Sequence, residues 1–143
     1  DYVDGQGESI WVSRAGVWAK RLIGLGPNLI PHPATMMRLD ALEAVGGYDE
    51  HLTLVMDLDV LLKLKKEGPF IHTPEVVSAF GWHSGSLTVH DRKASGLEAR
   101  MVKRRHLSGW VRFLEPLWEY PVSWASQIAA SRLNRRGKMV DTH

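Results

Sequence analysis

The stretch YDEHLTLVMDLDVLLKLKKEG, residues 48 to 68, constrains the fold of this chain more than any other. Its leucines at positions 58, 61 and 62 recur at the spacing of one helix face. Basic residues near the end of the run, followed by Gly68 and Pro69, are typical of a helix terminus. We therefore predict a helix over about residues 57 to 67.

Two aspartates stand at the start of this helix, one residue apart, and their pattern has two interpretations. Two carboxylates at positions i and i+2 supply the hard oxygen ligands that Mg²⁺ and Mn²⁺ prefer. Alternatively, Asp57 caps the helix and Asp59 occupies the first turn, where the positive end of the helix dipole favours an acid. The local sequence leaves both interpretations open.

Glycine and proline keep the other predicted elements short. Three prolines between positions 27 and 33 favour loop and extended chain there, because each disfavours the helical conformation in the residue before it. The other expected elements are a strand and then a helix within residues 10 to 23, a brief strand at 35 to 37, two β-prone pieces between 70 and 82, and a basic helix over about 91 to 107.

A further short helix is predicted immediately before the opening stretch. Asp40 and Glu43 fit a capping box, in which the first side chain accepts from free amides and the second reaches back. Gly46 and Gly47 then provide a stop, since glycine readily takes the left-handed conformation at a helix end. This helix should run from about residue 40 to 45.

Length and composition indicate one globular core. A chain of 143 residues gives no reason to expect two independent domains, and its hydrophobic fraction of 44% is ordinary for a folded protein. The sequence contains no cysteine, which excludes a disulfide framework, a thiolate metal site and a cysteine nucleophile. No run approaches the roughly 18 apolar residues of a membrane-spanning helix, and the start lacks the pattern of a signal peptide.

The order of residues from 30 to 68, and then from 72 to 88, resembles the acceptor-side half of glycosyltransferase family 2, nucleotide-sugar enzymes of the GT-A fold. The most specific parts are the Gly-Gly-aromatic-Asp-Glu run at 46 to 50, the acidic pair that follows it, and the His-x-Gly-Ser loop at 83 to 86. The resemblance covers about residues 1 to 107. It implies an α/β fold, a partial GT-A domain with a Rossmann-like mixed sheet, followed by C-terminal amphipathic helices.

The resemblance implies a catalytic role for the first aspartate of the pair. In the family, the acidic motif after the glycine run supplies the general base, so Asp57 is the expected base and Asp59 its supporting neighbour. Asp49 and Glu50 are expected to support the loop before the base. The family's own metal-binding Asp-x-Asp lies earlier, in the nucleotide-binding half, so the main ligands of the divalent cation, Mg²⁺ or Mn²⁺, are expected there.

The remaining site residues are also assigned by the resemblance. His83 matches a family histidine near the diphosphate and its metal, and neutral imidazole is a competent ligand. The expected substrate contacts are His32, Arg38, Lys63, Ser84 and Ser86. Each has a simpler interpretation as well: His32 as a rigid loop residue between two prolines, and the two serines as turn formers.

The tail, residues 108 to 143, lies outside the resemblance, and the C-terminal part of the chain from residue 100 is strongly basic. Residues 1 to 99 carry 9 Lys and Arg against 13 Asp and Glu, whereas residues 100 to 143 carry 9 against 3. Tryptophans and arginines on amphipathic helices, interrupted by Pro116 and Pro121, suit the headgroup zone of an anionic bilayer. Packing on the domain itself is the alternative, and no recognised motif supports nucleic-acid binding.

We therefore expect part of an inverting glycosyltransferase that transfers a sugar from a nucleoside-diphosphate donor to a hydroxyl of a glycan or lipid-linked acceptor in cell-envelope polysaccharide or glycolipid synthesis. The expected location is cytoplasmic, with peripheral contact at the inner membrane face. The chain resembles a catalytic domain that begins midway, without its donor half, and is not expected to catalyse transfer alone. The alternative is a non-catalytic module that binds glycan, membrane or protein. An incomplete sheet would also expose an edge for pairing with a second copy.

Overall fold

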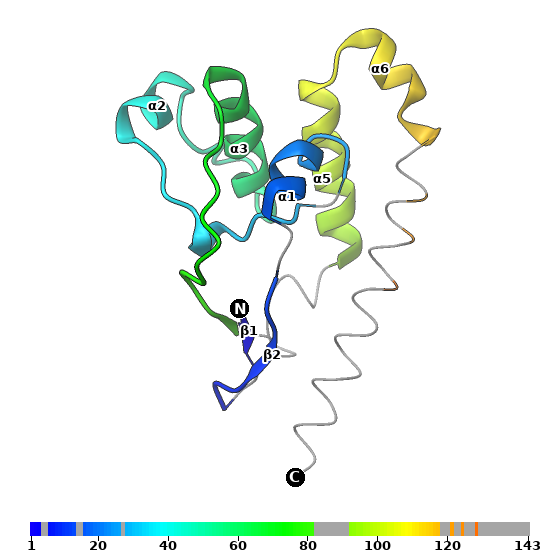
Figure 1. The fold of residues 1–143 in the computed structure, drawn as a ribbon. Coiled ribbons are helices and arrows are strands. Elements are labelled where there is room, and N and C mark those ends of the chain that lie inside the picture. Colours follow the sequence, from blue (N-terminus) through cyan, green and yellow to red (C-terminus); the bar gives the residue numbers. More distant parts are fainter. Residues whose placement is uncertain are drawn as a thin grey trace.

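The computed structural model of the protein describes residues 1–3, 6–13, 16–26, 28–81 and 92–117, together with Pro121, Trp124 and Ile128. This part of the chain combines helices with one small sheet, which confirms the predicted α/β class. The helices gather at one end of the molecule and the sheet lies at the other (Figure 1). The elements are β1 (Tyr2–Val3), β2 (Ser9–Trp11), α1 (Gly16–Leu22), the 3₁₀ helix η1 (His32–Ala34), α2 (Leu39–Ala44), α3 (Met56–Glu67), β3 (Phe80–Gly81), α5 (Arg92–His106) and α6 (Gly109–Leu114).

The sheet has the strand order β2-β1-β3, antiparallel between β1 and β2 and parallel between β1 and β3. Aromatic side chains stabilise it, because the ring of Tyr2 stacks on Trp11 at 5.5 Å and meets the edge of Phe80 at 5.8 Å. Burial raises the pKa of Tyr2. The parallel pairing joins two segments that lie 78 positions apart, as the register Tyr2↔Phe80 shows.

Helix α3 forms the centre of the core and confirms the helix predicted over 57 to 67. Its leucines at 58, 61 and 62 are each at most 4% exposed. They pack with Leu52 and Val55 from the preceding loop, with Ile23 immediately after α1, and with Val102 of α5. Full burial of one such side chain contributes about 1.5 to 3 kcal/mol, so this cluster holds α1, α3 and α5 together.

Two local predictions are wrong. Residues 35 to 37 form no strand, because the prolines before them support the 3₁₀ turn of η1, which extended chain follows. The capping box at Asp40 does not form either: α2 begins at Leu39 and its N-cap, Arg38, makes no side-chain cap bond. Asp40 instead lies inside the first turn, where it accepts from the N–H of Ala41 at 2.9 Å and pairs with Arg38.

The glycine stop after α2 is confirmed. Gly46 and Gly47 have φ values of +80° and +66°, in the left-handed region that favours glycine. Their N–H groups donate to the carbonyls of Glu43 and Leu42 at 3.0 and 2.9 Å. The chain therefore reverses here and enters the loop that precedes α3.

Helix α5 confirms the basic helix predicted over 91 to 107, and α6 begins the predicted tail helix. The tail is tied to α5 through Glu115, which is buried with 3% of its surface exposed. Its carboxylate pairs with Arg100 and Arg104, at 2.5 and 3.2 Å. Figure 1 shows α6 turning away beyond the end of α5. Most of the predicted second tail helix, 122 to 135, lies outside the described residues.

Candidate functional site

A surface hollow of about 430 Å³ lies at the N-terminal end of α3. It is lined by His32, Tyr48, Leu54, Met56 and Asp57. Two side chains that the sequence analysis selected separately, His32 and Asp57, therefore face one space although 25 positions separate them. Apolar and polar groups share the wall of this hollow, as is usual for a small-ligand site.

The carboxylate of Asp57 is held at the edge of this hollow by two hydrogen bonds. Its Oδ1 accepts from the N–H of Leu58 at 2.7 Å, and its Oδ2 accepts from the side-chain amide of Asn28 at 3.2 Å. The Oδ1 of Asn28 in turn accepts from the N–H of Ile30 at 3.2 Å, so the amide is itself held in place. Asp57 is half-buried and keeps one side toward the hollow.

Asp57 is the second residue of α3 rather than its cap, which corrects the cap interpretation. The N-cap position belongs to Val55, and no side chain at that position caps the helix. Glu98, from α5, accepts instead from the backbone immediately before the first turn. Its carboxylate accepts from the N–H groups of Thr53, Leu54 and Val55 at 3.0, 2.7 and 3.0 Å. A carboxylate at this end also suits the positive pole of the helix.

Glu98 is a residue that the sequence analysis missed. It fixes the loop that carries Leu54 and leads directly to Asp57, and both of those residues line the hollow. The only sequence signal is that Glu98 is the single acidic residue of α5. The N–H groups that donate to Glu98 are 43 to 45 positions away, so no local sequence motif predicts these hydrogen bonds.

His32 and Tyr48 form another polar part of the wall of the hollow. The Nε2 atom of His32 lies 2.7 Å from the hydroxyl of Tyr48, with the ring centroids 5.9 Å apart. Tyr48 is the aromatic residue of the Gly-Gly-aromatic-Asp-Glu run, which the sequence analysis used only as a marker. The structure thus places this run beside the expected base.

Asp59 lies in different surroundings from Asp57. It is 2% exposed, its Oδ1 lies 3.0 Å from His106 Nε2, and its Oδ2 lies 2.8 Å from Lys63 Nζ. Burial acts to raise the pKa of Asp59, but the hydrogen bonds and charges of His106 and Lys63 outweigh burial, so its pKa is lowered. The two aspartates do not converge on one point, since positions i and i+2 do not share a helix face.

Among the described residues, the other predicted site residues are not part of the wall of the hollow. Lys63 donates to the carbonyl of Gly47 at 3.2 Å besides pairing with Asp59. Asp49 does support the loop before α3, because its Oδ1 accepts from the N–H of His51 at 3.0 Å. That bond, together with Arg105 at 3.0 Å, lowers the pKa of Asp49.

Arg38 and Glu50 are both exposed. Arg38 pairs with Asp40, and the contact lowers the pKa of Asp40. The loop that holds His83, Ser84 and Ser86 lies outside the described residues.

Metal binding and membrane crossing can be judged for the described residues alone. No three His, Asp or Glu side chains in this part of the chain come close enough to hold a metal ion. None of its helices has both the length and the apolar character that crossing a bilayer requires. His83, the predicted metal contact, lies outside the described residues.

Comparisons with protein-family models, with curated proteins and with solved structures gave no match for this chain. Its own residues and the geometry of the hollow are therefore the basis for proposing a function.

Proposed function

We propose that the chain is the acceptor-side portion of an inverting glycosyltransferase with a GT-A fold, similar to family 2. In this proposal the hollow at the N-terminal end of α3 receives the acceptor sugar, and Asp57 is the general base. The observation that supports it best is that Asp57 and His32 line the same hollow. The sequence resemblance assigns Asp57 to catalysis and His32 to substrate contact, independently of any geometry.

The proposed step is a displacement at the anomeric carbon of the donor sugar. An acceptor hydroxyl within hydrogen-bond distance of Asp57 gives its proton to the carboxylate while its oxygen bonds to the anomeric carbon. The bond from that carbon to the diphosphate oxygen breaks, and the diphosphate leaves with the electron pair. Asn28 and the N–H of Leu58 fix the direction of the carboxylate, which keeps the base aligned with the hydroxyl.

The other walls of the hollow suit a sugar. The hydroxyl of Tyr48 and the ring of His32 provide donors and acceptors for the hydroxyl groups that do not react. Leu54 and Met56 offer apolar surface to the C–H face of a pyranose ring. The acceptor class that this arrangement favours is a glycan or a lipid-linked sugar.

The resemblance implies that the nucleotide-sugar and the divalent cation bind in a separate, donor half. Mg²⁺ or Mn²⁺ would supply charge neutralisation for the leaving diphosphate there, with His83 as an additional contact. The residues of this chain would bind the acceptor, orient its hydroxyl and accept its proton. Cell-envelope polysaccharide or glycolipid synthesis, at the inner face of the membrane, is the proposed setting.

The test is an Asp57→Asn variant of the full-length gene product, assayed for transfer and for acceptor binding. The amide keeps the shape of the side chain but does not accept a proton, so transfer should fall by a factor of about 100 or more while acceptor affinity changes little. Asp40→Asn, which alters an exposed aspartate outside the hollow, is the matched control. Undiminished turnover in the Asp57→Asn protein would eliminate the base assignment.

A second candidate, a non-catalytic module that binds membrane, is favoured by the exposed face of the early tail. Trp110, Phe113 and Leu117 are 73%, 86% and 73% exposed, and Arg104 and Arg112 lie nearby in sequence. Exposed aromatic residues beside arginines suit an anionic lipid surface. A Trp110→Ser, Phe113→Ser double variant should lose sedimentation with phosphatidylglycerol vesicles. Equal sedimentation of both proteins would remove this candidate.

A further inference from the structure

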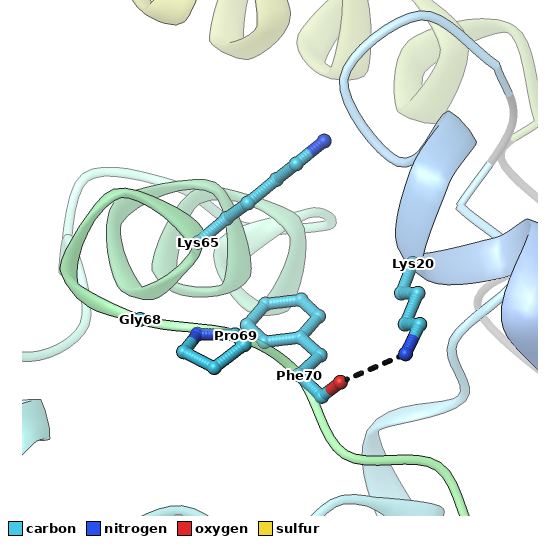
Figure 2. A pocket seen from close by; sticks show the side chains of 5 residues that line it. All are labelled: Lys20, Lys65, Gly68, Pro69 and Phe70. Carbon is cyan, nitrogen blue, oxygen red and sulfur yellow. Dashed lines mark hydrogen bonds between the residues drawn. The ribbon is translucent and has the colours of Figure 1, made fainter.

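A second hollow, of about 330 Å³, lies near the C-terminal end of α3. Figure 2 shows its lining: Lys20 from α1, Lys65 from α3, and Gly68, Pro69 and Phe70 from the chain that leaves α3. Asp57 lies eight positions before Lys65 on the same helix, which corresponds to about 12 Å along its axis. No residue is shared with the hollow at Asp57, so this space requires its own explanation.

Within the described residues, the two ammonium groups at this hollow are held by backbone carbonyls. Lys20 Nζ donates to the carbonyl of Phe70 at 3.1 Å, as Figure 2 shows, and Lys65 Nζ donates to the carbonyl of Arg21 at 3.4 Å. An ammonium has three N–H donors, so each lysine keeps donors for another partner. The two ammonium groups point in different directions in Figure 2, so both side chains turn when they bind one ligand.

Among the described residues, some basic residues of the helices are paired with carboxylates, unlike Lys20 and Lys65. Lys63 pairs with Asp59, and Arg105 pairs with Asp49. Within the part of the chain that the structure describes, neither Lys20 nor Lys65 has a carboxylate within ion-pair distance. Two positive charges thus remain uncompensated at one concave site, and such a site attracts an anion.

We propose that this hollow binds the phosphate group of a small soluble ester, with Lys20 and Lys65 both donating to the phosphate oxygens. Phosphate oxygens accept several hydrogen bonds at once, and ammonium groups are common phosphate donors. The organic part of the ester would lie against Pro69 and Phe70. A volume of about 330 Å³ is at the small end for ligand sites, so a sugar phosphate fits better than a dinucleotide.

The site is tested on the 143-residue chain by titration with inorganic phosphate and with glucose 1-phosphate, followed by NMR of the lysine side chains. Saturable shifts at Lys20 and Lys65, with tighter binding of the sugar phosphate, are expected. Lys20→Gln and Lys65→Gln should each weaken binding about tenfold, because each removes one charge-assisted contact. Lys66→Gln removes an equal charge from the next, exposed position of α3 and should leave binding within about twofold.

A further variant blocks the hollow without changing its charge. Gly68 has an extended backbone with φ of −178°, and a Cβ added there would meet no atom within 4 Å, so Gly68→Leu should fold normally. We expect it to abolish binding of glucose 1-phosphate while circular dichroism is unchanged. Equal weakening by Lys66→Gln, or unaltered binding in Gly68→Leu, would overturn the proposal.

Phosphatidylglycerol vesicles present the same phosphate chemistry on a lipid surface. Binding to these vesicles that depends on Lys20 and Lys65, combined with no saturable response to glucose 1-phosphate, would overturn the assignment to a soluble ester. The proposal does not depend on the role of Asp57. An Asp57→Asn protein should bind glucose 1-phosphate like the unaltered chain, so failure of one proposal is distinguishable from failure of the other.

Discussion

The Oδ1 atom of Asp59 lies 3.0 Å from Nε2 of His106, which joins the first turn of α3 to the last turn of α5. The Nδ1 atom of His106 is buried and has no hydrogen-bond partner among the described residues. Helix α5 contacts the N-terminal part of α3 a second time through Glu98.

This contact predicts how the stability of the fold depends on pH in acid. The pKa of Asp59 is lowered in the folded chain, so its contribution to the free energy of unfolding is complete above the ordinary carboxyl pKa of about 3.9. It is lost as the pH falls through the lower, folded value. Urea titrations between about pH 5 and pH 2 should show a decline that Asp59→Asn makes shallower.

The same variant has a large effect near neutral pH. Removing one partner of a buried ion pair typically costs about 3 to 5 kcal/mol, since Lys63 and His106 lose the charge that they face. The control is Asp49→Asn, whose surface pair with Arg105 should leave the urea midpoint nearly unchanged. Similar midpoints for the two variants would contradict the structural role of Asp59.

Glu98→Gln is predicted to destabilise the loop before α3. The amide oxygen accepts less strongly than a carboxylate, so the N–H groups of Thr53, Leu54 and Val55 lose charge-assisted partners, and the free energy of unfolding should fall by about 1 to 3 kcal/mol. Urea denaturation measures this change. Glu67→Gln, at an exposed position of the last turn of α3, should have little effect.

The tail should separate from α5 when Glu115 is altered. Glu115→Gln leaves Arg100 and Arg104 without the buried carboxylate that faces them both. We expect faster amide hydrogen exchange in α6, from Gly109 to Leu114, with little change in α3. Unchanged protection in α6 would mean that other contacts hold this segment.

Tyr48→Phe tests the polar wall of the hollow without disturbing the core. Tyr48 is 37% exposed, and its hydroxyl lies 2.7 Å from His32 Nε2. Loss of one hydrogen bond of about 1 kcal/mol corresponds to roughly fivefold weaker acceptor binding. Isothermal titration with an acceptor glycan would measure it, and an unaltered urea midpoint would show that the fold is intact. Unchanged affinity would contradict a role for Tyr48 in acceptor binding.

The sequence by itself determined the elements that depend on near neighbours. The leucine spacing of α3, the basic run of α5 and the stop at Gly46 and Gly47 are local patterns, and helical periodicity and backbone sterics translate them directly into structure. Helix starts were less predictable. Asp40 and Asp57 both looked like caps, yet each lies in the first turn of its helix.

Only the tertiary structure decided what each acid does. Asp57 and Asp59 are two positions apart and have similar local sequence surroundings. Packing of α5 against one side of α3 buries Asp59 with His106 and leaves Asp57 at the hollow. Glu98 acquired its role in the same way, from amides more than 40 positions away. The surroundings of a side chain depend on which distant segments pack beside it, and local periodicity does not predict those segments.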